Sequence, residues 1–173
     1  MAVLISPVTP ADVDAVVALA RRIWQATYPE IISQQQIDYM LEQRYSPTHI
    51  LDELATPRIW WDQAHADGVL SGFACSLITG NGEMKLDKVY VDPARQGLGI
   101  GRKLIEAVAS RAVADGCAAL ILAVNKRNQR AIAAYHRLGF AVRDSVCVDI
   151  GGGFVMDDFI MVRSLIGRRA ASR

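Results

Sequence analysis

The sequence has no strong imbalance of charge and no long apolar run. Its 173 residues include 19 lysines and arginines against 18 aspartates and glutamates, so the formal net charge is only +1. A chain without a global positive field has no electrostatic preference for nucleic acid or an anionic membrane. No apolar run approaches the ~18 residues of a spanning helix, and residues 1–5 lack the features of a signal peptide. We therefore expect a cytoplasmic protein without a nucleic-acid or membrane partner.

Cysteine is also scarce. The three cysteines, Cys75, Cys117 and Cys147, are widely spaced and form no Cys-x-x-Cys pair or Cys/His cluster. This pattern gives no indication of a structural zinc site, and we expect no metal. Each cysteine lies within an apolar run, which predicts buried free thiols in a reducing compartment.

The composition that is present is that of an ordinary globular chain, with 51% apolar and 21% charged residues. A chain of this length fits one domain and can bury roughly 70% of the surface that its unfolded form exposes. We expect a single domain over residues 1–165. Residues 166–173 form a basic end that predicts a flexible, solvated tail.

Local signals predict mixed α/β (α+β) architecture with helices on both faces of a mixed sheet. Thr9 and Ser33 are candidate caps of the first two helices, and Asp67-Gly68 predicts a two-residue hairpin turn. The nearly continuous apolar run 118–124 predicts a strand covered on both faces. The expected strands are 3–5, 59–66, 69–78, 84–91, 118–124, 142–150 and 154–162, and the later helices are 100–114 and 129–137.

A glycine-rich loop joins the strand 84–91 to the helix 100–114. Glycines alternate at 97, 99 and 101, where they allow positive φ angles and a close approach of backbone to a ligand. Backbone N–H groups that converge at a helix N-terminus favour a phosphate or pyrophosphate. The dinucleotide pattern fails because residue 102 is arginine, and the nucleoside-triphosphate pattern fails because no Gly-Lys pair exists. The loop alone leaves a plain turn equally open.

The context of the loop resembles the GNAT superfamily of N-acetyltransferases. Residues 96–101, Gln-Gly-Leu-Gly-Ile-Gly, match the Gln/Arg-x-x-Gly-x-Gly/Ala signature of that family, and residues 124–140 resemble its second signature. The resemblance covers residues 1–165, and the phrases at 27–29, 36–41 and 151–161 are similar to the polyamine-acetylating branch. It implies a GNAT-like, mostly antiparallel sheet of about seven strands and acetyl-CoA as co-substrate.

The resemblance also implies which residues bind the cofactor. The pyrophosphate is expected on the backbone N–H groups of Gln96, Gly97, Leu98, Gly99, Ile100, Gly101 and Arg102. The backbone of Val89, Tyr90 and Val91 is expected to be bulged and splayed, and to pair with the pantetheine arm. One N–H group there would polarise the thioester carbonyl as an oxyanion donor. Asn128 matches a cofactor-contacting asparagine, and it can also cap the helix 129–137.

Tyr135 is the expected general acid. A phenol of pKa ~10 can protonate a departing thiolate whose conjugate acid has a pKa of ~8.5. Without the motif, Tyr135 would be interpreted as a core tyrosine. The base is expected among Glu83, Asp87 and Asp92, or is a water molecule, and Lys85 stands where relatives often place an acid.

These residues predict direct acetyl transfer to a primary amine in a ternary complex, since no cysteine falls within the motif. The acceptor is expected to be a small-molecule or peptide amine. The alternatives are a non-catalytic acyl-CoA sensor and a nucleotide transferase. Aromatic residues at 24, 28 and 39 could pack or hold an amine cation, and the last strands could pair in a homodimer.

Overall fold

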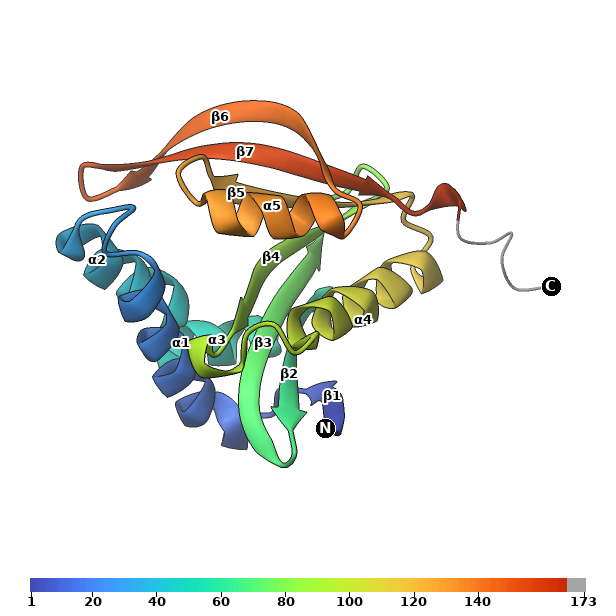
Figure 1. Ribbon diagram of the computed structural model, residues 1–173, viewed down its shortest axis with the longest axis horizontal. Helices are drawn as coiled ribbons and strands as arrows, with labels where there is room; N and C mark the ends of the chain where they lie inside the picture. The colour runs from blue at the N-terminus through green and yellow to red at the C-terminus, as the bar shows by residue number, and fades with distance from the viewer. Residues whose placement is uncertain (168–173) are drawn as a thin grey trace. The chain divides into compact units, whose positions relative to one another are not determined.

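The computed structural model describes residues 1–167, and residues 168–173 of the predicted tail lie outside the described residues (Figure 1). The helices are α1 (Val13–Thr27), α2 (Gln34–Tyr45), α3 (Pro47–Leu54), α4 (Ile100–Ala114) and α5 (Gln129–Arg137). The strands are β1 (Val3–Pro7), β2 (Ile59–Ala66), β3 (Val69–Ile78), β4 (Glu83–Val91), β5 (Ala119–Asn125), β6 (Ala141–Gly151) and β7 (Phe154–Ser164).

The strands form one mixed sheet in the order β1-β2-β3-β4-β5-β7-β6. β2 pairs antiparallel with β1 and β3, and β7 pairs antiparallel with β5 and β6. Only β4 and β5 pair in parallel among the pairs defined by register in residues 1–167. The predicted mixed, mostly antiparallel sheet of seven strands is therefore confirmed.

The contacts within the chain group it into two compact units. The first contains residues 1–77 and 88–107, and the second contains residues 78–87 and those from 108 onward. The division passes through β4 and α4, so the first half of β4 belongs to the second unit and its second half to the first.

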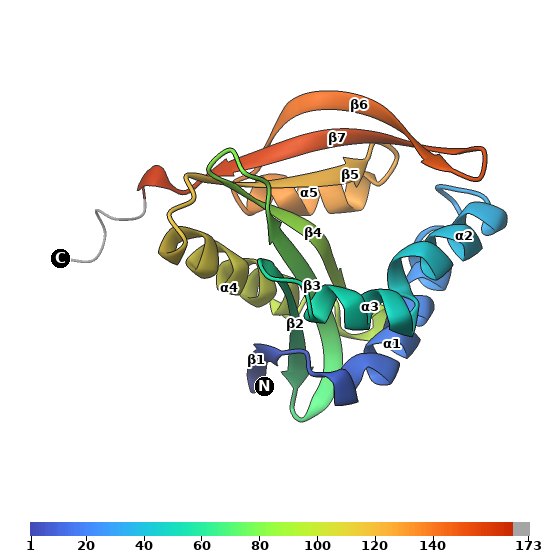
Figure 2. The ribbon, with the colours of Figure 1, turned by 180° about the vertical axis from the view of Figure 1, so that it is seen from behind.

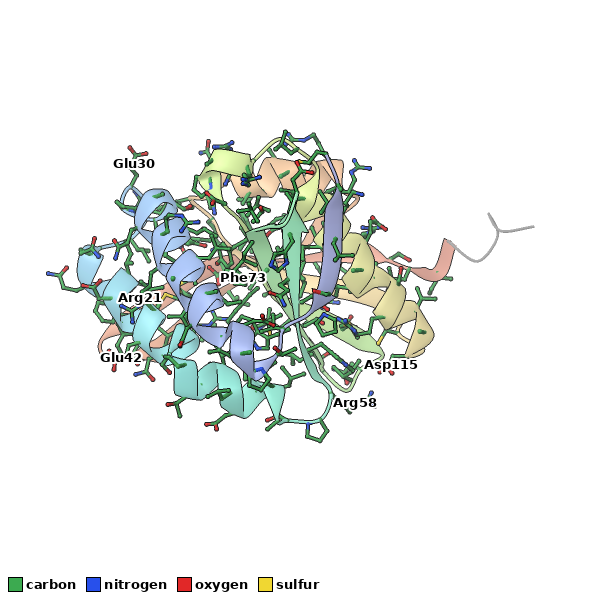
Figure 3. All side chains as sticks on the ribbon, turned by 90° about the horizontal axis from the view of Figure 1, so that it is seen from below. Arg21, Glu30, Glu42, Arg58, Phe73 and Asp115 are labelled. Atoms are coloured by element: carbon green, nitrogen blue, oxygen red, sulfur yellow. The ribbon has the colours of Figure 1, made fainter. Side chains whose placement is uncertain are left out.

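In the first unit, helices cover both faces of β3. A Cβ atom placed on Gly72 would lie 3.2 Å from Leu104 of α4. On the opposite face, the ring centroid of Phe73 (labelled in Figure 3) lies 5.9 Å from that of Tyr45 on α2. Successive residues of a strand point to opposite faces, so β3 is buried on both sides. The prediction of helices on both faces holds for this unit.

Local turn and capping signals are confirmed in part in the first unit. Thr9 caps a short 3-10 turn, Pro10–Asp12, and α1 begins only at Val13 with Asp12 at its cap, so the expected first helix starts three residues later. The Thr9 backbone N–H donates to the Asp12 carboxylate at 2.8 Å, and this bond holds the pKa of Asp12 below its usual value. The Ser33 hydroxyl accepts the Gln36 N–H at 3.1 Å, as expected of a helix cap. Asp67 and Gly68 both have positive φ, 50° and 80°, as a type I′ hairpin turn requires.

The helix α3 is absent from the elements predicted from the sequence. Its signal is present, because the Ser46 hydroxyl accepts the His49 N–H and Pro47 occupies the first helical position. Serine at the cap followed by proline is a standard helix start. The eight residues of α3 are too few to display a clear apolar period, which is the main signal by which a helix is predicted.

The second unit contains β5, α5 and the long hairpin of β6 and β7, which run side by side in Figure 2. Nearly every residue of β6 is exposed, so the expectation that Cys147 is buried is wrong. Cys75 is buried as expected, and Cys117 is only half-buried. β6 ends the sheet order and has a strand neighbour on one side only. The homodimer through these last strands stays a prediction.

The prediction for the apolar run of β5 is only partly correct. Leu120, Leu122 and Val124 are buried. On the other face of the strand, Ala123 is exposed, and Ala119 and Ile121 are half-buried. The alternation shows that one face of β5 is packed more closely than the other. Small and branched apolar residues at alternate positions give a continuous apolar run without requiring equal burial of both faces.

Residues 1–167 show neither a membrane-spanning helix nor a cluster of metal-binding side chains. No helix in this part of the chain is long and apolar enough to cross a membrane. No group of three or more histidine, cysteine, aspartate or glutamate side chains gathers there in a way that could hold a metal ion.

Candidate active site

The glycine loop has the backbone conformation that its sequence predicts. Gly97 and Gly99 have φ angles of 80° and 79°, which residues with a Cβ rarely adopt. α4 begins at Ile100, and the Lys103 N–H donates to the Gly99 carbonyl at 3.1 Å. Gln96, Leu98 and Arg102 are exposed, so the loop and the first turn of α4 face solvent. Exposed N–H groups at a helix start suit a phosphate group.

Gly101 has a different role from the other two loop glycines. It lies inside α4, and a Cβ atom there would lie 3.5 Å from the Val91 side chain. This is ordinary van der Waals contact, so Gly101 brings the first turn of α4 close to the end of β4. The Gln96 side-chain amide also donates to the Val91 carbonyl at 3.4 Å, which ties the loop to the same strand end.

Gly72 on β3 is a functional candidate that the sequence interpretation missed. A Cβ atom at this position would lie only 2.8 Å from the Tyr90 backbone carbonyl oxygen. The neighbouring strand therefore sits so close that only glycine fits. An isolated glycine inside a predicted strand is a recognised signal of a close backbone approach, and it was the clue available in the sequence.

The pairing of β4 with β5 ends early. Glu83, Met84 and Lys85 pair in parallel with Ala119, Leu120 and Ile121. β5 continues to Asn125, yet neither Leu86 nor Asp87 pairs with it within the second unit. The last residue of this register, Lys85, lies four positions before the Val89–Val91 segment that the sequence pattern assigns to the cofactor.

Asn128 caps the short helix α5 of the second unit, and Tyr135 lies on that helix. The Asn128 side-chain oxygen accepts the Ala131 N–H at 3.3 Å, so the capping role of Asn128 is observed directly. Tyr135 is half-buried, and its ring packs edge-on against Phe140 with centroids 5.8 Å apart. The Phe140 N–H donates to the Tyr135 carbonyl at 3.0 Å, which fixes the residues that follow the helix.

The candidate base Glu83 is held by an arginine. Both of its carboxylate oxygens accept hydrogen bonds from the guanidinium of Arg143, one of them at 3.3 Å. Hydrogen bonding to Glu83 raises the pKa of Arg143, so the guanidinium stays charged at neutral pH. The bidentate contact fixes the orientation of the Glu83 carboxylate.

Asp87 lies closer to the Val89–Val91 segment along the strand. Its side chain is only 13% exposed, and its carboxylate lies 3.5 Å from the Lys85 ammonium. The two residues share one face of β4 because they are two positions apart. The unexpected lysine at position 85 therefore accompanies the acidic residue rather than replacing it.

Asp92, the third candidate base, is bound on both oxygens. One oxygen accepts a hydrogen bond from the Arg22 guanidinium at 2.7 Å, and the other accepts a hydrogen bond from the Ala94 N–H at 3.0 Å. Burial acts to raise the pKa of Asp92, but the bonds from Arg22 and Ala94 outweigh it and leave the pKa below its usual value. Asp92 is thus a fixed, ionised anchor between α1 and the start of the loop.

Aromatic rings of the first unit form a continuous cluster, which consists of Trp24, Tyr28, Tyr45, Trp61, Phe73 and Tyr90. The ammonium of Lys88 is inside it, 5.1 Å from the Trp61 ring centroid and 5.6 Å from that of Tyr45. The chain therefore supplies its own cation to these two rings. Trp61 is core, as expected for one of the adjacent tryptophans.

Comparison with known proteins agrees with this arrangement. A family model described as the acetyltransferase (GNAT) family matches residues 16–140. An uncharacterized N-acetyltransferase of Mycobacterium bovis is 27% identical over 155 residues, covering 90% of this chain and 99% of the relative. Spermidine N(1)-acetyltransferase of Thermoplasma acidophilum is 26% identical over 161 residues, covering 91% and 97%.

Solved structures show the same fold. The crystal structure of the PaiA N-acetyltransferase from Thermoplasma acidophilum in complex with coenzyme A superposes with a TM-score of 0.83. It is 26% identical in sequence, and the match covers 95% of this chain and 99% of that one. A GCN5-related N-acetyltransferase from Rhodopseudomonas palustris, 21% identical, superposes with a TM-score of 0.80 over 95% of this chain and 96% of its own.

Proposed function

Since the chain belongs to the acetyltransferase (GNAT) family and is an acetyl-CoA-dependent acyltransferase, we propose that it acetylates a primary amine by direct attack in a ternary complex. The amine nitrogen bonds to the thioester carbonyl carbon, the C–S bond breaks, and coenzyme A leaves. One proton must leave the amine and one must reach the departing sulfur. The observation that carries this proposal is the glycine loop with its positive φ angles at the start of α4.

The loop residues 96–102 are proposed to bind the pyrophosphate of the donor through their backbone N–H groups. Exposed glycines leave these groups accessible, and the positive end of α4 favours an anion. The backbone of Val89–Val91 is proposed to bind the pantetheine arm and to donate one hydrogen bond to the thioester oxygen. The early end of the β4–β5 pairing supports this assignment.

Replacing Gly99 with alanine is expected to weaken coenzyme A binding about tenfold. The positive φ of residue 99 is strained for alanine at a cost of roughly 1 kcal/mol, and relief of that strain reorients the loop N–H groups. Gly116 provides a matched control, because its φ is 81° and an added Cβ meets nothing within 4 Å, as at Gly99. Calorimetric titration should show weaker binding for Gly99→Ala only, although both variants lose similar stability. Equal coenzyme A affinity in the two variants would remove the loop from the donor site.

Tyr135 is proposed as the general acid that protonates the coenzyme A thiolate. Its place on α5, after the capping Asn128, matches the motif from which the role was predicted. The phenol is half-buried and its ring is oriented by Phe140. A fixed phenol is suited to deliver one proton in a defined direction. Asn128 is proposed to contact the cofactor in addition to capping the helix.

Asp87 is proposed as the group that receives the amine proton, directly or through water. Asp87 lies on β4 two positions before Val89, and its side chain is 13% exposed, so it is the candidate carboxylate on the strand that leads into the proposed thioester-binding segment. An alkylammonium with a pKa of ~10.4 must lose its proton before it attacks. A carboxylate beside the strand end also attracts the cationic acceptor.

Replacing Asp87 with asparagine is expected to lower kcat/KM about tenfold at pH 7. The loss should shrink as the pH approaches ~10, because the free amine then needs no base. The matched control is Glu83→Gln, which should stay within about twofold of wild type, since removal of an exposed ion pair costs little. A pH–rate series on the three proteins decides between the carboxylates. A larger loss in the Glu83 variant would make Glu83 the base.

The acceptor is proposed to be a primary amine carried by a small molecule or a peptide. The spermidine N(1)-acetyltransferase relative makes polyamines the first compounds to test. The rings of Tyr45 and Trp61 do not serve as a cation site for the acceptor in this proposal, because Lys88 already occupies that position.

Calorimetry with coenzyme A, acetyl-CoA, ATP and NAD tests the donor assignment. The expected result is binding of both coenzyme A compounds and no binding of the two nucleotides. Binding of ATP or NAD without binding of coenzyme A would replace the proposal with a nucleotide-dependent enzyme.

A further inference from the structure

Three polar side chains alternate along the second half of β4 and the residue after it. Lys88, Tyr90 and Asp92 are two positions apart, so they share the face of the strand that is turned to the helices α1 and α3. Each contacts a polar side chain of that helical layer. We name these three contacts, Lys88–Glu53, Tyr90–Tyr28 and Asp92–Arg22, the helix-facing ladder.

The first contact of the ladder is a buried ion pair. The Lys88 ammonium, with only 2% of its side chain exposed, lies 3.7 Å from a Glu53 carboxylate oxygen on α3. Glu53 is itself fixed, because its carboxylate also binds His49 and accepts the Cys75 thiol at 3.7 Å. A buried pair with several partners is rigid, and breaking it leaves a charge without compensation.

The second and third contacts both join β4 to α1. The hydroxyl oxygens of Tyr28 and Tyr90 are 2.9 Å apart, within hydrogen-bonding distance. Arg22 donates to Asp92 at 2.7 Å, and the Asp92 N–H donates to the Ser71 carbonyl at 2.8 Å. Tyr28 terminates α1 and Arg22 lies nearly two helical turns earlier, so one helix holds two points of the strand.

A strand that donates backbone hydrogen bonds to a ligand needs support from elsewhere. A backbone donor that binds a ligand is not held on that side by pairing with a neighbouring strand. A displacement of about 1 Å at such a donor can cost a large factor in rate. Side-chain contacts on a packed scaffold are the usual means of holding such groups in position.

We infer that Arg22, Tyr28 and Glu53 are positioning residues that hold the backbone donors of Val89–Val91 in the orientation for acetyl transfer. This inference rests on the proposed function for its catalytic meaning. They act through Asp92, Tyr90 and Lys88 and need not touch the donor or the acceptor. The ladder also links α1 to the strand that carries the thioester, so that changes in α1 are expected to alter the rate.

Hydrogen exchange of the ligand-free protein tests the structural half of the inference. Arg22→Gln and Tyr28→Phe each remove one contact, and exchange at those amides of residues 89–91 that pair with β3 is expected to accelerate about fivefold. Arg22→Lys should restore part of the protection, because lysine can pair with Asp92. Arg21→Gln is the matched control. Arg21 is the exposed residue next to Arg22 on α1 (Figure 3), and it lines a pocket with Asp38 and Glu42 that contains no residue of the ladder.

Kinetics and infrared spectroscopy test the catalytic half. In Arg22→Gln and Tyr28→Phe, kcat is expected to fall about tenfold while the dissociation constant of coenzyme A changes less than about twofold. The carbonyl band of bound [1-13C]acetyl-CoA should move toward its frequency in free solution, because the hydrogen bond to the thioester oxygen is weakened. Arg21→Gln should match wild type in all three measurements.

The outcomes separate the ladder from the proposed function. Unchanged exchange at residues 89–91 in both variants overturns the ladder, even if their melting temperatures fall. Faster exchange with unchanged kcat and carbonyl frequency also overturns the catalytic role. A wild-type protein that neither binds coenzyme A nor acetylates any amine refutes the proposed function. In that case the hydrogen-exchange result still shows whether the ladder stabilises residues 89–91.

Discussion

Replacing Tyr135 with phenylalanine is expected to lower kcat about 100-fold, because the departing thiolate loses its proton donor. The ring and its edge-on contact with Phe140, at 5.8 Å, are retained. Stability and coenzyme A affinity should therefore stay close to wild type. A phenol acid of pKa ~10 would give the wild type an alkaline limb in its pH–rate profile, and this limb should disappear in the variant.

The same variant distinguishes an enzyme from a sensor. A protein that only reports acyl-CoA binding would be indifferent to the loss of one hydroxyl group, provided that coenzyme A still binds. Steady-state rates across pH 6–10, together with a coenzyme A titration, make the comparison. Retention of wild-type kcat and of the alkaline limb in Tyr135→Phe would exclude Tyr135 as the acid.

Replacing Gly72 with alanine is expected to destabilise the protein by about 3 kcal/mol and to weaken coenzyme A binding about tenfold. The added methyl group would lie 2.8 Å from the Tyr90 carbonyl oxygen and 3.2 Å from Leu104. Backbone atoms cannot rotate away as a flexible side chain can, so β4 must shift. That shift moves the proposed thioester-binding segment as well as the packing of α4.

A glycine-to-alanine change in open space is the control for the Gly72 variant. A Cβ atom added at Gly167 would meet nothing within 4 Å, and the φ of this residue is not positive, so Gly167→Ala should retain wild-type stability. Chemical denaturation and calorimetry on the two variants give the comparison. A Gly72→Ala protein with wild-type stability and affinity would show that β3 and β4 are not as close as described.

The elements that local signals determine were predictable from the sequence. Helix 100–114 was predicted with its observed bounds, and the turn at Asp67-Gly68 was identified because its φ angles require such residues. Short or edge elements were less predictable. α3 has only eight residues, and the exposure of Cys147 depends on β6 having a strand neighbour on one side only. Neither fact is contained in a local pattern.

In the candidate site, too, local features were predictable from the sequence and long-range contacts were not. Gly97 and Gly99 were predicted from spacing, since their role is a local backbone conformation. The contacts of Glu83 with Arg143 and of Asp92 with Arg22 join residues 60 and 70 positions apart. Sequence alone could identify the three carboxylates but could not show which were already engaged. The ladder on β4 was hidden for the same reason, although its period of two was visible.

Turnover with an amine tests the central claim most directly. Purified protein is mixed with acetyl-CoA and a panel of spermidine, small amines and peptides, and free thiol is followed while product mass is measured. We expect amine-dependent thiol release and an acetylated amine in equal amounts. Absence of thiol release with every amine, together with absence of coenzyme A binding by calorimetry, would contradict it.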